Sequence, residues 1–196
     1  MERVFRQMKQ ILCTRRSGLS LLAGGLVLAL ALAPAGCKSE PKTVRVVDPE
    51  REAPPPLAST LKGSDTRRGG QFLNGFYGVE ANAWRWTAKQ FSVLLRTPAE
   101  AAQSGAELSL AFTIPDVAID HAGGTLTLSA SVEGTPLKPE TYSKSGAYVY
   151  KREVPLAALA KDAVRIQFSL DKAIPPAGAE RRELGIIVNS ISLQAL

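Results

Sequence analysis

Cysteine and histidine are scarce in this sequence of 196 residues, and their scarcity excludes several kinds of reactive site. Cys13 and Cys37 are the two cysteines, so no thiol follows residue 37 for catalysis, zinc binding or an internal disulfide. The single histidine, His121, stands beside a glycine pair, where a surface turn is more common than a catalytic role. The sequence also lacks nucleophile-elbow, phosphate-loop and dinucleotide-binding motifs. It therefore predicts a protein with no enzyme activity, no cofactor and no metal site.

Residues 71–196 also lack net charge, because they contain twelve basic and twelve acidic side chains. The formal net charge of +6 at pH 7 belongs instead to residues 1–70. A nucleic-acid-binding domain would present a basic face with aromatic side chains among the cations. The sequence has no such pattern, so we expect no nucleic-acid partner.

The first 36 residues change from basic to apolar to small. Residues 1–18 contain five basic side chains against one acidic one, and residues 19–33 read "LSLLAGGLVLALALA". This apolar run is shorter than the roughly 20 residues of a transmembrane helix. The progression is typical of a secretory signal peptide, which we assign to residues 1–36. An alternative interpretation is a membrane-anchoring helix with an incidental cysteine after it.

The residues around Cys37 resemble the lipobox of bacterial lipoproteins, in which the cysteine is lipidated through sulfur and becomes the mature N-terminus. Ala35 and Gly36 match that motif, whereas Pro34 stands where the family usually has leucine. The resemblance implies that Cys37 carries fatty acyl chains such as palmitate, and that these chains attach the protein to a membrane of the cell envelope. Lys38, rather than aspartate, follows the cysteine. By the same resemblance, this residue favours the outer membrane.

Residues 37–70 contain five prolines and many charges but no aromatic residue. A segment of this composition cannot bury enough apolar surface to offset the entropy of ordering its backbone. We therefore expect a disordered tether between the lipid anchor and a domain that begins at residue 71.

Alternation of apolar and polar residues dominates residues 71–196. In "TLTLSASV" the apolar side chains share one side of an extended chain and the serines and threonines share the other, as in a half-buried strand. Residues 155–162 alone indicate a short helix. Seven or eight short strands separated by turns predict an all-β domain, an antiparallel β-sandwich of jelly-roll type. The expected strands occupy residues 71–80, 84–87, 91–97, 107–114, 125–134, 147–154, 164–170 and 184–194.

Four of the twelve aromatic residues lie in "NGFYGVEANAWRWTAKQ", residues 74–90. In an extended segment Trp84 and Trp86 point one way and Arg85 points the other. One interpretation is structural, with the indoles in the core and Glu80 paired to Arg85. The other is a glycan site, in which aromatic faces stack on a sugar ring and charged side chains bind its hydroxyl groups. The candidate ligand-binding residues are Tyr77, Glu80, Trp84, Arg85 and Trp86.

Two segments resemble a known type of domain. "GFYGVEANAWRWT" and "VPLAALAKDAVRIQFSLDKAIPPAGAERRELGIIVNSISL" are similar to a β-sandwich appended to bacterial glycosyltransferases and other envelope proteins. That domain belongs with galactose-binding-like and carbohydrate-binding jelly rolls. The shared features are a Gly-Phe-Tyr start, a spaced glutamate, Arg-Trp-Thr and the final "RELGI", and they cover residues 74–196. The resemblance implies a fold and a glycan ligand, without a reaction.

Together these features predict a noncatalytic, lipid-anchored protein of the cell envelope whose β-sandwich binds, or is associated with, glycans. The alternative is a structural or assembly lipoprotein that docks onto another envelope protein through a sheet face or an edge strand. Exposed aromatic side chains near residues 76–86 favour the first class. A buried aromatic cluster together with an apolar outer sheet face favours the second.

Overall fold

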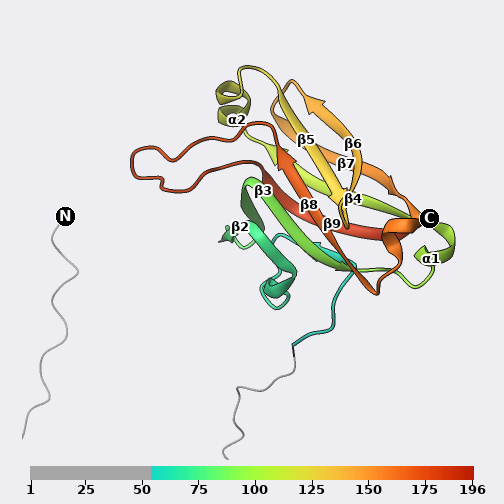
Figure 1. Cartoon of the computed structure of the whole chain (residues 1–196). Helices are drawn as coiled ribbons and strands as arrows, with labels where there is room; N and C mark the ends of the chain where they lie inside the picture. Colours follow the sequence, from blue (N-terminus) through green and yellow to red (C-terminus); the bar gives the residue numbers. More distant parts are fainter. Residues whose placement is uncertain (1–53) are drawn as a thin grey trace, which may run out of the picture. The chain divides into compact units, whose positions relative to one another are not determined.

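Nine antiparallel strands build the part of the chain that the computed structural model describes, residues 54–196 (Figure 1). The strands are β1 (Thr60–Lys62), β2 (Phe72–Glu80), β3 (Trp84–Arg96), β4 (Ala106–Ile114), β5 (Leu126–Val132), β6 (Thr135–Tyr142), β7 (Gly146–Val154), β8 (Ala163–Leu170) and β9 (Ile187–Ala195). Between them lie the short helices α1 (Ala101–Ser104) and α2 (Asp116–His121) and the 3-10 turns η2 (Gly69–Gln71) and η3 (Leu156–Leu159).

The predicted signal peptide, the lipidation site Cys37 and residues 37–53 of the predicted tether lie outside the described residues. Within residues 54–196, no helix has both the length and the apolar character needed to cross a membrane.

The strands form two facing layers that share β3. The hydrogen-bonded order is β6-β5-β8-β3-β9-β4-β7, with β1 paired to β9 and β2 paired to β3. The part of β3 from Gln90 to Arg96 pairs with β8, whereas Arg85 and Trp86 pair with β9. One layer is therefore β6-β5-β8-β3-β2, and the other is β1-β9-β4-β7 with the start of β3 also paired to β9. The two layers overlap in Figure 1. The predicted fold class, an antiparallel β-sandwich, is confirmed.

The core lies between the layers because alternation turns one side of each strand inward. Burial alternates residue by residue along all of β4, where Leu108, Leu110 and Phe112 are buried. β5 and β8 show the same alternation in the facing layer. Within that layer, Phe91 of β3 stacks on Phe168 of β8 with their ring centroids 4.9 Å apart. Burying one such side chain contributes about 1.5–3 kcal/mol, so these positions hold the layers together.

Some elements differ from the sequence-based prediction. The sequence does not predict β6, because Pro136 and Pro139 interrupt its apolar pattern. It lies at the edge of its layer, where a proline can be accommodated without removing a ladder hydrogen bond. The helix expected at 155–162 is the single turn η3, and α1 and α2 are additional short helices.

The folded domain begins before residue 71, the boundary that composition predicts. Residues 60–62 pair with β9 as β1, and Leu61 is fully buried. Gln71 fixes the same segment, because its side-chain amide exchanges hydrogen bonds of 3.0 Å with the backbone of Ala58. A three-residue strand with one buried leucine barely changes local composition, which is why the sequence assigned it to the tether.

Candidate functional site

The five residues predicted to bind ligand lie on both strands of one hairpin. Tyr77 and Glu80 belong to β2, and Trp84, Arg85 and Trp86 begin β3. Ala81 and Asn82, which connect the strands, both have positive φ, 48° and 53°, and the Ala83 N–H donates to the Glu80 carbonyl at 3.0 Å. This is the geometry of a tight turn that matches the twist of paired strands.

Arg85 binds backbone groups of its own domain. Its guanidinium donates to the carbonyl of Tyr77 at 2.9 Å and to the carbonyl of Asp65 at 3.0 Å, and lies 4.7 Å from the ring centre of Phe72. Burial lowers the pKa of Arg85 from its usual value, and the charge of Asp65 opposes that change. Arg85 therefore joins β2 and β3 to the loop that follows β1.

Tyr77 and Glu80 bind the long connection between β8 and β9. The Tyr77 hydroxyl donates to the Glu183 carbonyl at 2.7 Å. Arg182 lies 5.1 Å from the Tyr77 ring centre and pairs with Glu80 at 2.8 Å. Arg182 also hydrogen-bonds Glu180 and lowers the pKa of that carboxyl to about 2. The polar groups of Tyr77 and Glu80 thus hold this loop against the hairpin.

Trp84 and Trp86 lie on the opposite side of β3 from the core. Thr87 is fully buried, and its hydroxyl accepts from the Ile186 N–H at 3.1 Å. Alternation therefore directs the two indoles away from the core, and both residues are half-buried. The same alternation places them on the side of β3 that carries Gln90 and Ser92. Of the two indoles, that of Trp84 has a buried N–H without a partner among the described residues.

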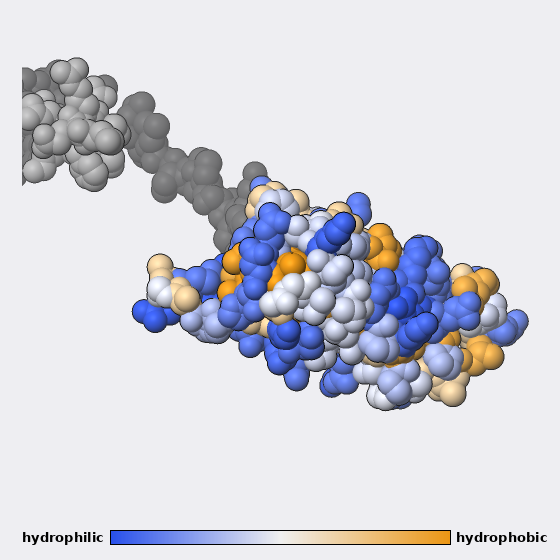
Figure 2. Space-filling view, turned by 90° about the horizontal axis from the view of Figure 1, so that it is seen from above, coloured by the Kyte–Doolittle hydropathy of each residue, from blue (hydrophilic) through white to orange (hydrophobic). Residues whose placement is uncertain are grey.

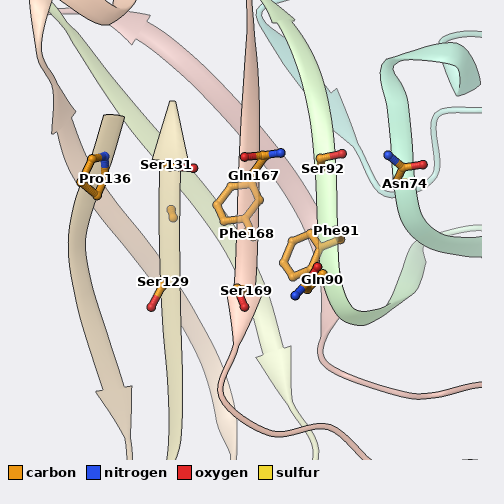
Figure 3. A pocket seen from close by; sticks show the side chains of 11 residues that line it. Asn74, Gln90, Phe91, Ser92, Ser129, Ser131, Pro136, Gln167, Phe168 and Ser169 are labelled. Atoms are coloured by element: carbon orange, nitrogen blue, oxygen red, sulfur yellow. The ribbon is translucent and has the colours of Figure 1, made fainter. Parts of the chain in front are cut away.

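A groove of about 450 Å³ crosses the outer face of β5, β8 and β3, a site that the sequence analysis missed. Figure 3 shows its polar side chains in two rows that run across the strands. The strand register pairs Ser92 with Gln167 and Gln167 with Ser131, and one pleat away it pairs Gln90 with Ser169 and Ser169 with Ser129. Asn74 of β2 and Pro136 of β6 end the first row. The stacked rings of Phe91 and Phe168 lie beneath.

The lining side chains are neutral, and their polar groups are almost all free of internal hydrogen bonds. None of Asn74, Gln90, Ser92, Ser129, Ser131 and Gln167 bonds through its side chain to another described residue, and Ser169 makes one long bond of 3.4 Å to a neighbouring carbonyl. Hydroxyl and amide groups both donate and accept hydrogen bonds. The groove can therefore bind an uncharged polyhydroxyl chain, and it contains no ionisable group for acid–base chemistry.

One sequence signal could have located this groove. The tripeptide Gln-Phe-Ser occurs at residues 90–92 and again at 167–169. The two copies lie antiparallel on β3 and β8, so each glutamine faces a serine across the strands and the phenylalanines pair. Residues 54–196 contain no comparable arrangement for binding a metal, because no cluster of His, Cys, Asp or Glu in this range could hold an ion.

Comparisons with known proteins assign no family to the chain. No family model matches the sequence, and no curated protein matches it. Solved structures match only in overall arrangement. One is the CBM36-1 domain of a multidomain xylanase from the hindgut metagenome of Trinervitermes trinervoides, at 10% identity and a TM-score of 0.33, covering 55% of this chain and 71% of that one.

Two further matches have similar values. An exo-β-1,3-galactanase from Phanerochaete chrysosporium is 12% identical with a TM-score of 0.34, and the match covers 70% of this chain and 29% of that one. A CBM4 structure is 12% identical with a TM-score of 0.33, covering 70% and 85%. Likenesses this distant carry no inference about a ligand, and the assignment of the sandwich rests on the strand pairing itself.

Proposed function

We propose that this β-sandwich is a noncatalytic glycan-binding domain and that the groove on β5, β8 and β3 is its glycan site. The observation that carries the proposal is the double row of neutral side chains whose hydroxyl and amide groups, apart from the long Ser169 bond, have no hydrogen-bond partner within residues 54–196. A sugar offers closely spaced hydroxyl groups that donate and accept, which is the complement of such a surface. Each hydrogen bond contributes about 0.5–1.5 kcal/mol, so several together give binding of modest affinity.

Trp84 and Trp86 extend the proposed site along β3. Trp86 is four residues before Gln90, which corresponds to about 13 Å along a regular strand. An indole at that distance would stack on a sugar unit next to the one held by the groove, contributing about 0.5–1.5 kcal/mol beyond its buried area. The polar groups of Tyr77, Glu80 and Arg85 already bind other parts of the domain. The proposal therefore places sugar hydroxyls on the groove and keeps the two indoles as the aromatic platform.

Gln167→Ala is expected to weaken glycan binding by about three- to tenfold, as expected for the loss of one neutral hydrogen-bonding group. Tryptophan fluorescence and calorimetry of the full chain, titrated with neutral oligosaccharides of several linkages, measure this effect. Gln194→Ala is the matched control, because Gln194 is also an exposed glutamine but lies on β9 in the other layer. Equal losses in both variants, or no binding by the unmodified protein to any neutral or acidic glycan, would contradict the proposal.

The docking alternative has less support from the surface. Figure 2 shows hydrophilic residues spread over the displayed face, with hydrophobic residues in separate spots. The exposed large hydrophobic residues lie on different segments rather than on one sheet face: Leu57, Val117, Val149, Leu156 and Leu196. An apolar docking face would gather such residues into one patch.

We further propose that Cys37 carries the lipid that holds this domain at the cell envelope, in the outer membrane. The support is in the sequence, where a basic and then apolar segment ends in small residues and a cysteine that has no partner after it. Stable anchoring requires more than one acyl chain, at about 0.8 kcal/mol per buried methylene.

Cys37→Ala is expected to move the protein from the detergent phase to the aqueous phase in a partitioning experiment. The reason is that the acyl chains, and not residues 19–33, supply the membrane affinity. Cys13→Ala is the control, since Cys13 lies within the predicted signal peptide. Full retention of Cys37→Ala in the detergent phase would show that the apolar segment is the anchor.

A further inference from the structure

We propose that the glycan bound by this domain is acidic, and that Arg165 and Arg96 bind its carboxylate groups at one end of the groove. This inference rests on the proposed glycan-binding function and narrows its ligand class. A second hollow, of about 440 Å³, continues the groove at this end, and Gln167 lines both. The groove therefore passes from a neutral surface to a charged one along the same strands.

The strand register places the two arginines next to the last neutral row. Arg165 pairs with Leu94, one pleat away from the Ser92–Gln167 pair, and both residues line the second hollow. Arg96 is two residues beyond Leu94, so alternation directs it to the same side of β3. A sugar chain that contacts Ser92 and Gln167 and continues along the strands would thus meet Arg165 about 7 Å further on.

The acid in this hollow is already bound to its neighbours. Glu133 and Gly134 form the two-residue turn between β5 and β6, with φ of 49° and 85°. One carboxylate oxygen of Glu133 pairs with Lys161, and the other accepts from the Arg165 N–H at 2.7 Å. The hydrogen bond from Lys161, followed by that from the Arg165 backbone, lowers the pKa of Glu133. Glu133 therefore holds the turn, and although its charge also acts on the Arg165 guanidinium, the two side chains form no ion pair.

The guanidinium groups of Arg165 and Arg96 have all their hydrogen-bond donors available for a ligand, although Glu133 interacts with the charge of Arg165. Both residues are exposed, and neither side chain makes a hydrogen bond or ion pair with any residue in the range 54–196. Asp162, the nearest further acid in the chain, is exposed and does not line the hollow. A guanidinium binds a carboxylate through two parallel hydrogen bonds, which a hydroxyl group cannot replace. Neutral rows beside free arginines fit a sugar chain that carries carboxylates.

The test compares polygalacturonate oligomers with their fully methyl-esterified forms, which share a backbone and differ in charge. The full chain is titrated by calorimetry in low and high salt. We expect the acid form to bind about tenfold more tightly than the ester in low salt, and the difference to shrink in high salt. Arg165→Gln is expected to lower affinity for the acid form to that for the ester, and to leave ester binding unchanged. Arg96→Gln should have a smaller effect in the same direction.

Arg181→Gln is the matched control, because Arg181 is an exposed arginine outside both hollows. The melting temperature of each variant is measured as well. A value equal to that of the parent protein shows that a loss of binding does not result from unfolding. Equal binding of acid and ester would overturn this inference and leave the glycan-binding function standing. Binding of polyglutamate or anionic lipid vesicles as tightly as the acid glycan would also overturn it. Absence of binding to both glycan forms and to all neutral oligosaccharides would remove the proposed function itself.

Discussion

Replacing Gly75 by alanine is expected to lower the free energy of unfolding by roughly 3 kcal/mol or more, a large share of the 5–15 kcal/mol typical of a domain. Gly75 has a φ of +71°, which L-residues rarely adopt. A Cβ there would lie 1.9 Å from the Gln90 carbonyl oxygen and 2.8 Å from the Cα of Phe91. Because both are backbone atoms, no side-chain rotation relieves the overlap. Chemical denaturation monitored by tryptophan fluorescence measures the loss.

Gly78→Ala is the control for this prediction. Gly78 belongs to the same strand, and a Cβ at that position meets no atom within 4 Å. Alanine there should change stability by less than about 1 kcal/mol. Equal stability of the two variants would contradict the close approach of the β2 backbone to the β3 backbone at Gly75. The same crossing leads into Asn74 and Gln90, so a folded Gly75→Ala protein should also bind glycan more weakly.

Arg85→Ala is expected to lower the free energy of unfolding by about 2–4 kcal/mol. The substitution removes two hydrogen bonds from a charged donor and leaves the carbonyls of Tyr77 and Asp65 without that partner. Hydrogen bonds to charged groups contribute about 1.5–3 kcal/mol each, although their losses do not add fully. The contact with Phe72 is lost as well. Thermal and denaturant unfolding report the change.

Arg96→Ala provides the comparison for stability, because Arg96 is an exposed arginine on the same strand whose side chain makes no hydrogen bond or ion pair with residues 54–196. Its removal should alter stability by less than about 0.5 kcal/mol. A stable Arg85→Ala protein with normal unfolding but abolished glycan binding would restore Arg85 to the ligand site, as one interpretation of the sequence has it. A destabilised protein that still binds glycan would establish its structural role.

Local pattern was sufficient to predict most of the strands. Alternation located β4, β5, β7 and β8 because a strand with one buried side repeats with a period of two residues. The alternating pattern is weaker in strands that bury few residues or contain proline. β6 contains Pro136 and Pro139, and β1 contributes Leu61 as its one buried residue. Their strand character comes from pairing with β5 and β9, which no local signal reports.

The aromatic cluster shows the same limit, because the local sequence locates it but does not assign its role. Composition drew attention to Trp84, Arg85 and Trp86, since aromatic residues and charges gather there. Whether Arg85 faces a ligand or the domain depends on the carbonyl of Asp65, twenty residues earlier in the chain. The partner of Glu80 is Arg182, which is 102 residues away. Contacts at such separations leave no mark on the local sequence, so the ligand-binding role of this cluster stays a prediction.

The sequence by itself determined that residues 71–196 have no net charge, no cysteine and the alternating pattern typical of β-strands, and that a basic and then apolar segment precedes Cys37. These properties depend on residue type and spacing, which need no knowledge of distant neighbours. Only the tertiary structure decided that the two Gln-Phe-Ser segments lie side by side and continue a row begun by Ser129 and Ser131. Strand register sets that placement, because sliding one strand by a single residue would turn the groove's polar side chains into the core.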